Sequence, residues 1–585
     1  MSHLSNNAIR LNYNFMGKSL EVDTFSQSDV WFLTLPYFTS NQNTDLNSIN
    51  RYINSFIDAA NENATIIILA SPFYSSYFLS EPKLLANLKV WIGLSVTDIY
   101  QKDGQLNQTH AALLVLTKYE KSLEHTKTRI SYSFCPHCDR TTKDYGGKKH
   151  LYHEFGTLMS DVWRDITISY NGDLKSVVDR LKDIFGIEPY KSLNHIDLRF
   201  NKFKTLSNPT FKLQEFGDAI NEIPFNESTL LNGDCLEELR QIPDNSIDFC
   251  FADPPYNIKK KYESWNDEID IVEYFKWCDR WTTELARVIK PKRTVALLNI
   301  PRWAVRHFKH LITLLDFQDW IIWEALGLPV RMIMPAHYTV LCFSKGEPRP
   351  MPGLTRDFNS KLESLVLNTY KQGYCKRISC VKKRVKKQIH DREFVSNLWW
   401  DIHRLKHNSR RIDHPTQLPP MFMYRLISLF TNESEIVLDP FNGAGTTSLC
   451  SEQLNRRFIG IEISEYYHTI STNRHKELRE GIDPFRKNDN VPRAKNSYVE
   501  RLKKRKYEVD KKTLQLEVKE ISKRLGRIAT RKDVIENTKY KIEYFDNYFI
   551  NWSEVTAAAR TTGMAQVENK NDYNMIVDSD KLKNT

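Results

Sequence analysis

Short, predominantly apolar runs recur along the chain, and turn-forming residues follow several of them. In the second half such runs cover residues 247–252, 435–438 and 458–461, and in the first half they lie within 29–38 and 108–118. An apolar run without polar alternation is typical of a strand buried on both faces, as in the sheet of an α/β protein. Helix-compatible residues follow the run at 435–438, so the pattern predicts the strand–turn–helix order of an α/β fold.

The first 215 residues resemble a degenerate second copy of the later half. Segment 29–38 is similar to the strand and turn that begin at 247, segment 108–118 to 335–345, and segment 160–166 to 396–402. These likenesses fall in the same order in both halves, which favours duplication over chance. We therefore expect one α/β domain at 1–215 and another at 216–480. An unrelated α/β domain with similar strands is the alternative for the first.

The other segments differ in composition. Residues 346–412 lie between the strand groups of the second half and are dense in Lys and Arg, with Tyr and Trp interleaved. A charge run is usually a solvated face, but this mixture favours contact with a polyanion. After about residue 480 the chain becomes basic and polar. A stretch with helical spacing of apolar residues then begins, marked by Leu516, Val518, Ile521 and Leu525.

The C-terminal stretch also carries a resemblance. Residues 521–531, with 544–545 and 551–555, resemble the small helical repeats attached to homing endonucleases. The resemblance implies a compact three-helix DNA-binding module at 513–563. The alternative is a helical bundle that docks on the core. We expect a disordered tail at 564–585.

Bulk properties limit the class of protein. The 585 residues are enough for three or four domains. Lys and Arg outnumber Asp and Glu by 83 to 72, and the net charge of +11 suits a polyanionic partner. The nine scattered cysteines indicate a reducing compartment. Because neither a signal-type run nor an apolar run of about 18 residues is present, we expect a cytoplasmic protein without a membrane span.

The tetrapeptide Asp253-Pro254-Pro255-Tyr256 closes the run at 247–252. A carboxylate such as Asp253 can accept a hydrogen bond from the exocyclic amino group of a base. The carbonyl before a proline can accept a second, which draws the nitrogen lone pair out of the ring plane. Tyr256 offers a flat surface for a base taken out of the stack, and the prolines stiffen the turn. Asp-Pro-Pro turns also end ordinary strands, so the assignment needs a partner motif.

The partner motif lies downstream. The run at 435–438 is followed by the glycine-containing turn 439–447, and the run at 458–461 ends in Glu462. Small residues at a strand-to-helix turn let the backbone approach a ligand and aim free N–H groups at it. An acid at the end of the next strand is the usual partner of ribose hydroxyls in nucleotide-type α/β folds.

In this order the motifs resemble those of S-adenosylmethionine-dependent DNA amino-methyltransferases of the permuted, beta-type arrangement. Residues 232–237 and 414–417 are similar to that family too, whereas Leu418 stands where a lysine is common. The resemblance covers about residues 226–475 and implies a Rossmann-like methyltransferase fold. It places target recognition at about 346–412 and catalysis at Asp253, Pro254, Pro255 and Tyr256. The residues that it implies for S-adenosylmethionine are Asp234, Thr416, Asp439, Phe441, Gly443, Gly445, Thr446 and Glu462.

The first half contains a candidate metal site. Cys135 and Cys138 are followed by His150 and His153, and two Cys with two His can bind structural zinc. The spacing is slightly short for a zinc finger, so a polar loop that contacts phosphate is the alternative.

The resemblance implies a site-specific adenine-N6 methyltransferase of double-stranded DNA, in a restriction–modification system with a separate endonuclease. Asp rather than Ser at position 253 favours adenine. Cytosine-N4 methylation, RNA amino-methylation and a catalytically silent DNA-binding protein stay open, while no metal-carboxylate nuclease set is visible. Thr34 and Leu35 replace the carboxylate and the first proline in the first copy. We therefore expect a monomer that is an internal pseudo-dimer with one active site.

Overall fold

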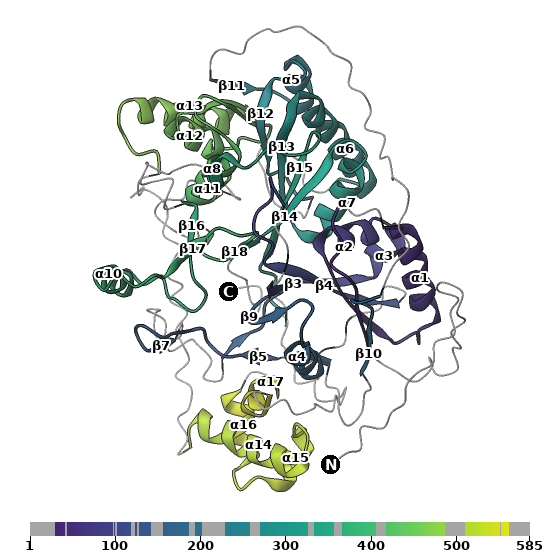
Figure 1. The fold of residues 1–585 in the computed structure, drawn as a ribbon. Coiled ribbons are helices and arrows are strands. Elements are labelled where there is room, and N and C mark those ends of the chain that lie inside the picture. Colours follow the sequence, from purple (N-terminus) through teal and green to yellow (C-terminus); the bar gives the residue numbers. More distant parts are fainter. Residues whose placement is uncertain are drawn as a thin grey trace.

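The computed structural model of the chain describes residues 30–40, 44–97, 99, 102–118, 123, 125, 128–141, 156–185, 193–201, 228–257, 269–325, 333–355, 366–404, 417–485, 509–549 and 552–560. Two mixed sheets dominate these residues, and a group of helices follows at the C-terminal end (Figure 1). The chain is therefore a mixed α/β protein, as the apolar runs predict.

The first sheet has six strands and belongs to the first half of the chain. In spatial order they are β10 (Leu193–Asp197), β1 (Val30–Thr34), β2 (Thr65–Ala70), β4 (His110–Thr117), β3 (Leu88–Thr97) and β9 (Val162–Ser169). Alternate residues of β1 face opposite sides, so both faces must be covered. The helices on one face are α1 (Leu46–Ala59), α2 (Pro72–Leu79) and α3 (Pro82–Asn87), and α4 (Lys175–Phe185) covers the other.

The second sheet has eight strands. Their order is β11 (Thr229–Asn232), β20 (Arg457–Glu462), β19 (Ile436–Asp439), β12 (Ile247–Ala252), β13 (Ile289–Asn299), β15 (His337–Ser344), β14 (Asp316–Glu324) and β18 (Leu398–Trp399). The runs at 247–252, 435–438 and 458–461 are thus confirmed as the strands β12, β19 and β20. The helices on one face are α5 (Cys235–Gln241), α6 (Ile271–Val288) and α7 (Pro301–Leu311), and those on the other are α8 (Pro352–Thr355), α11 (Pro420–Phe430) and α12 (Thr446–Gln453).

Strand order and direction agree between the two sheets. The series β1-β2-β4-β3-β9 and the series β12-β13-β15-β14-β18 both pair as parallel, antiparallel, antiparallel and parallel. The pairs β3–β4 and β14–β15 each carry one register shift, between Leu88 and Val90 and between Phe317 and Asp319. Beyond each series the sheet continues with parallel strands: β10 beside β1 in the first sheet, and β19, β20 and β11 beside β12 in the second. Such agreement supports the proposal that the halves are copies of one unit.

The two units meet through corresponding elements. Trp91 of β3 stacks on Trp320 of β14, with ring centroids 4.3 Å apart and an interplanar angle of 1°. Helix α2 packs on α7, where the rings of Phe73 and Phe308 are 6.0 Å apart. An interface in which each partner offers the same patch is the pattern of a two-fold dimer. Within this chain the two partners are covalently joined.

Backbone hydrogen bonds across this interface are reciprocal. The N–H of Asp161 donates to the carbonyl of Met334 at 3.1 Å, and the N–H of Asn397 donates to the carbonyl of Asn107 at 3.1 Å. The Asp161 carboxylate accepts from the Ala336 N–H at 2.7 Å. The Asn397 amide oxygen accepts from the Thr109 N–H at 2.9 Å. Each unit therefore supplies backbone hydrogen bonds to the other. The side chains of Asp161 and Asn397 play equivalent parts, because each accepts a backbone N–H from the opposite unit.

We expect Asp161→Asn to flatten the dependence of stability on pH. Burial raises the pKa of Asp161 from 3.8 to about 7, although the backbone N–H groups of Ala336 and His337 oppose the shift. Between the unfolded pKa of 3.8 and the folded pKa of about 7, the carboxyl group is protonated in the folded chain and ionised in the unfolded chain. The stability that the group contributes is therefore present below its unfolded pKa and is lost as the pH rises to about 7. Asparagine keeps the accepting oxygen but does not titrate.

Urea midpoints measured at several pH values for the wild type and Asp161→Asn test this. The variant should gain stability relative to the wild type as the pH rises toward neutrality. An identical pH dependence in both chains would contradict the assignment of the proton to Asp161.

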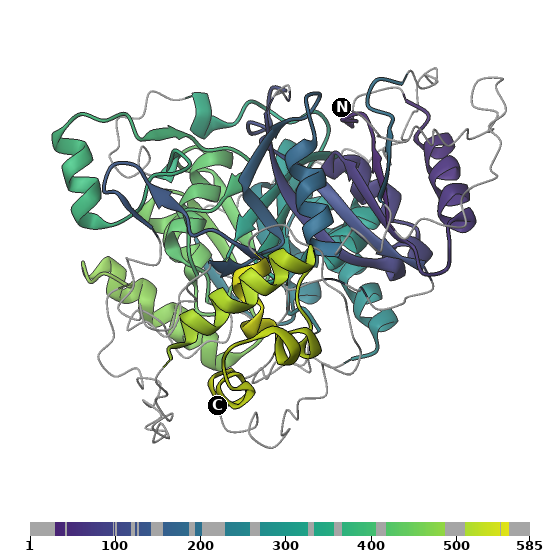
Figure 2. The same cartoon turned by 90° about the horizontal axis from the view of Figure 1, so that it is seen from below.

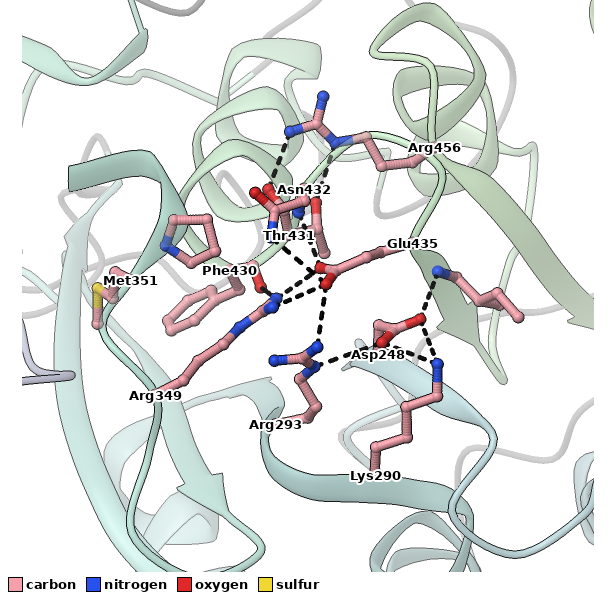
Figure 3. Close-up of polar contacts among 12 residues, drawn as sticks. Asp248, Lys290, Arg293, Arg349, Met351, Phe430, Thr431, Asn432, Glu435 and Arg456 are labelled. Carbon is pink, nitrogen blue, oxygen red and sulfur yellow. Dashed lines mark hydrogen bonds and ion pairs between the residues drawn. The ribbon is translucent and has the colours of Figure 1, made fainter. Parts of the chain in front are cut away.

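A buried ion-pair network fixes the amino-terminal end of the second sheet (Figure 3). The Asp248 side chain is 3% exposed, and both of its oxygens lie 2.9 Å from the Lys290 ammonium. Asp248 also accepts from Arg293 at 3.3 Å and from the Ile436 N–H at 3.0 Å. Arg293 reaches Glu435 at 3.1 Å. The network therefore ties β12, β13 and β19 together at the edge opposite their carboxyl ends.

Asp248→Ala is expected to lower the free energy of unfolding by about 3 kcal/mol, because it leaves cations and a backbone N–H without their buried partner. The matched control is Asp58→Ala. Its partner Lys83 is 3.0 Å away, and both side chains are 61% exposed, so the control should cost at most about 1 kcal/mol. Denaturant unfolding measures both. An equal loss in the two variants would show that the network does not stabilise the sheet.

The C-terminal helices form their own core. They are α14 (Lys511–Leu525), α15 (Arg531–Asn537), α16 (Ile542–Tyr548), α17 (Trp552–Val555) and α18 (Ala557–Arg560), and they gather as one compact group (Figure 2). Val518 and Ile521 are buried, as predicted, but Leu516 and Leu525 are each 38% exposed. The buried face instead begins at Leu514, four residues before Val518. No helix among the described residues is long and apolar enough to cross a bilayer.

Candidate active site

Four neighbouring parallel strands bring their carboxyl ends to one edge of the second sheet. These strands are β11, β20, β19 and β12. Asp234 follows β11, whereas Glu462 and Asp439 end β20 and β19, and Asp253 follows β12. Ligands of open α/β sheets bind beyond this edge. Four acids that are far apart in the sequence are therefore gathered around one position.

The turn after β12 is held by three hydrogen bonds. The Tyr256 hydroxyl donates to the Asp253 carboxylate at 2.9 Å, and the Tyr256 side chain is largely buried. The Tyr274 hydroxyl of α6 donates to the carbonyl of Pro255 at 2.7 Å. The Trp303 indole of α7 donates to the carbonyl of Tyr256 at 3.0 Å. The carboxylate and the aromatic ring are thus fixed before any ligand arrives.

An aromatic and cationic group lies over this turn. The ring of Tyr338 is 6.5 Å from the ring of Tyr256, and the Arg404 guanidinium lies 4.0 Å from the centroid of Tyr338. Burial lowers the pKa of Arg404, and the nearby Tyr256 and Asp253 act in the opposite direction. A flat base above Tyr256 would therefore meet a surface of aromatic rings and a planar cation. Periodicity gave no signal for Tyr338, and Arg404 was one of many basic residues in its segment.

The glycine turn between β19 and α12 has the backbone shape that requires glycine. Gly443 and Gly445 have φ values of 51° and 86°. A Cβ on Gly445 would lie 2.3 Å from the Ser471 hydroxyl. The Gly443 N–H donates to one Glu462 oxygen at 2.7 Å, and the Ser464 N–H donates to the other at 2.8 Å. The turn and the acid of β20 are therefore one rigid unit.

The electrostatics of this edge favour a cationic ligand. Burial raises the pKa of Asp439 to about 7, and the charges of Asp253 and Glu462 add to the shift. Burial also raises the pKa of Glu462. Carboxyl groups held this close gain from a positive charge placed among them. A sulfonium or ammonium group would supply it.

The remaining predicted residues take several positions. Asp234 caps α5 by accepting from the Leu236 N–H at 2.8 Å, and its neighbour Gly233 donates to the Glu462 carbonyl at 3.1 Å. Phe441 packs between Trp277 and Trp281 of α6, with ring centroids 5.7 and 5.1 Å away. Thr446 begins α12 and is 7% exposed. Thr416 lies outside the described residues.

The corresponding edge of the first sheet is filled by its own side chains. Thr34, at the position matching Asp253, donates to Asp197 of β10 at 2.8 Å. Arg199 follows β10 and donates to the Tyr170 carbonyl at 2.6 Å and to Asp197. β10 stands where β19 stands in the second sheet, but a salt bridge takes the place of a glycine turn.

Cys135 and Cys138 meet a second pair of cysteines. The sulfur of Cys135 lies 4.0 Å from that of Cys380, and the sulfur of Cys138 lies 3.8 Å from that of Cys375. All four sulfurs lie within 4.8 Å of one another. His150 and His153 lie outside the described residues. The structure therefore brings two cysteines of the second half to the first pair, and the contribution of His150 and His153 stays a prediction.

Comparison with known proteins gives one family model and many relatives. The model of the N6/N4 DNA methylases matches residues 247–473. Type II methyltransferase M.BamHI of Bacillus amyloliquefaciens is 35% identical over 335 residues, which cover 55% of this chain and 76% of that protein. DNA adenine methyltransferase YhdJ of Escherichia coli is 27% identical over 246 residues, 41% of this chain and 79% of that one.

Among solved structures, a putative DNA modification methylase from Thermus thermophilus, complexed with S-adenosyl-L-methionine, is similar over 43% of this chain and 94% of its own. The identity is 19% and the TM-score is 0.29.

Proposed function

Since the chain belongs to the N6/N4 DNA methylase family, we propose that it methylates the N6 amino group of adenine in double-stranded DNA, with S-adenosylmethionine as donor. The observation that carries this proposal is the common strand edge, where the Asp253–Tyr256 turn lies beside the glycine turn and Glu462. The similarity to a protein named as a type II methyltransferase supports a role in restriction–modification, and we propose a separate endonuclease as partner.

The donor set fits S-adenosylmethionine. The cofactor carries a sulfonium and an ammonium group, and the edge offers the carboxyl groups of Asp439 and Glu462. Glu462 already accepts two backbone N–H bonds, and each carboxylate oxygen has a further lone pair for a ribose hydroxyl. Asp234 lies beside Glu462 through Gly233. When bound, the cofactor supplies an electrophilic methyl group for direct transfer.

The chain itself orients and activates the amino group. Asp253 accepts a hydrogen bond from the exocyclic N–H, which raises electron density on the nitrogen and fixes its direction. Tyr256 and Tyr338 stack on a base that has left the duplex. The Tyr256 hydroxyl holds the carboxylate in place until the base arrives. Catalysis then rests on positioning and hydrogen bonding, with no covalent enzyme intermediate.

Cytosine N4 is the second candidate for the base. Both bases present a conjugated exocyclic amino group beside a ring nitrogen, so the Asp253 turn can serve either, and the family model covers both classes. Asp rather than Ser at position 253 favours adenine. Identification of the methylated nucleoside decides between the two bases, because the same turn would give N6-methyladenine from one and N4-methylcytosine from the other.

We further propose that residues 1–215 act as a non-catalytic copy that helps to hold DNA. Thr34 replaces the carboxylate, and the Arg199–Asp197 pair fills the position of the glycine turn. The chain should therefore bind one S-adenosylmethionine. The basic segment 346–412 and the helical module at 513–563 are proposed to contact the phosphate backbone and grooves.

A calorimetric titration and a transfer assay test these proposals on the full chain. One cofactor per chain is expected, and labelled methyl groups should pass to duplex DNA and not to RNA. Two equivalent cofactor sites would refute the silent first copy. Transfer to RNA alone would show that the substrate is RNA and not double-stranded DNA.

A further inference from the structure

Four cysteines from opposite halves of the chain share one cluster. Cys135 and Cys138 belong to the hairpin of β6 (Phe134–Cys135) and β7 (Arg140–Thr141). Cys375 precedes α10 (Ile378–Lys386), and Cys380 lies in its first turn. The members of each facing pair are 245 and 237 residues apart in the sequence. A cluster built from a hairpin and a helix that are so far apart in the sequence is a junction between the halves.

The spacing of the sulfurs fits a tetrahedral metal ion. Four thiolates bound to zinc at about 2.3 Å lie about 3.8 Å from one another. The facing pairs here are 4.0 and 3.8 Å apart, and all four sulfurs lie within 4.8 Å. A disulfide needs sulfurs about 2 Å apart, which is roughly half of these distances. Four cysteines without an open position match the closed sites of structural zinc.

A buried arginine completes the surroundings of the cluster. The Arg384 side chain is 0% exposed, and one of its N–H groups donates to the Cys380 sulfur at 2.9 Å. A second N–H donates to the carbonyl of Cys375 at 2.8 Å, and a third pairs with Asp391. Four thiolates around one divalent ion leave two negative charges, and the Arg384 N–H at the Cys380 sulfur stabilises part of this charge. Hydrogen bonds of this kind to metal ligands fix the orientation of the ligating side chains.

The cluster also supports a basic surface. Lys382, Lys383 and Lys386 of α10 and its C-terminal cap Lys387 are exposed. The apolar side chains of Ile378 and Val385 are also exposed, at 75% and 69%. The strands β16 (Asn368–Tyr370) and β17 (Arg392–Phe394) flank this helix. Figure 1 shows α10 projecting beside β7, away from both large sheets. Such a small unit has little core of its own, so it needs a further constraint to keep a fixed position.

We propose that the four cysteines bind one structural zinc ion, which joins the 134–141 hairpin of the first half to the α10 unit of the second. The zinc fixes the direction in which α10 presents its lysines. The consequence for DNA rests on the proposed function, whereas the zinc itself can be measured without DNA or cofactor.

Metal analysis of the purified full chain tests the site. The wild type should hold one zinc per chain, and cobalt in its place should give the thiolate charge-transfer bands of a tetrahedral site. Cys375→Ser should bind zinc at least about tenfold more weakly in a chelator competition, since even changes beside a metal ligand cost that much. Cys342→Ala, which removes a buried thiol outside the cluster, should keep its zinc.

A wild-type chain without stoichiometric zinc, or a Cys375→Ser variant that binds zinc as tightly as Cys342→Ala, would overturn the site. For its role, Cys375→Ser should weaken DNA binding at least about tenfold and leave S-adenosylmethionine binding within about twofold. Unchanged DNA affinity would overturn the role of zinc in presenting α10. Retained cofactor binding shows that the variant is folded and separates this failure from one of the proposed function.

Discussion

Replacing Asp253 with alanine is expected to lower methyl transfer by about a thousandfold or more, the scale reached when a positioned hydrogen-bonding group is lost. The carboxylate is assigned to the target amino group, and its present partner is the Tyr256 hydroxyl at 2.9 Å. Glu462 is held instead by the N–H groups of Gly443 and Ser464. S-adenosylmethionine affinity should therefore stay within about twofold, as measured by calorimetric titration beside a transfer assay.

Tyr256→Phe is the matched control for this prediction. It removes the hydroxyl that donates to Asp253 but keeps the ring for the base. It should retain part of the activity, whereas Tyr256→Ala should lose most of it. An Asp253→Ala enzyme that turned over normally but bound the cofactor poorly would reverse the assignment.

Glu462→Ala is expected to show the opposite pattern, with cofactor binding weaker by about 1–3 kcal/mol. This acid accepts from Gly443 at 2.7 Å and from Ser464 at 2.8 Å, so it both binds and shapes the turn. Its loss leaves two N–H groups and the ribose without an acceptor. Titration of the folded variant, with a thermal melt as a check, measures the effect.

Glu452→Ala is a suitable control, because this acid lies near the carboxyl end of α12, whereas the turn precedes the helix. Glu452 pairs with His475 and with Arg479, the latter at 2.7 Å. Its cofactor affinity should match that of the wild type. Normal affinity in Glu462→Ala would place the cofactor elsewhere on the chain.

The strands that carry the chemistry were predictable because they are short and buried on both faces. The apolar runs before Asp253 and before Asp439 end within a residue of β12 and β19. Glu462 ends β20 as expected. Runs this short, with Asp-Pro turns directly after Ala252 and Leu438, favour buried strands over helices, so their length and their flanking residues were sufficient.

Contacts between distant segments were not predictable from local pattern. Tyr274 and Trp303 lie on the apolar faces of helices α6 and α7, so the sequence pattern marks them only as core residues. It gives no sign of the hydrogen bonds that they donate to the catalytic turn. Local spacing pointed from Cys135 to the nearby histidines and gave no signal for Cys375 and Cys380, which the fold places beside Cys135. The stack of Trp91 on Trp320 likewise depends on the packing of two whole units. These features depend on the order of the strands and on the packing of the two units. The internal repeat suggested that two similar units exist, but the hydrophobic periodicity did not specify how they pack.

Nucleoside mass spectrometry of DNA tests the central claim most directly. DNA is taken from a host without its own DNA methyltransferases, after expression of the wild-type chain or Asp253→Ala. The wild type should produce N6-methyladenine, and the variant should produce none. N4-methylcytosine that disappears in the variant would keep the role of Asp253 and move the base to cytosine. Host DNA that contains neither methylated base, or methylation that persists with Asp253→Ala, would contradict the account.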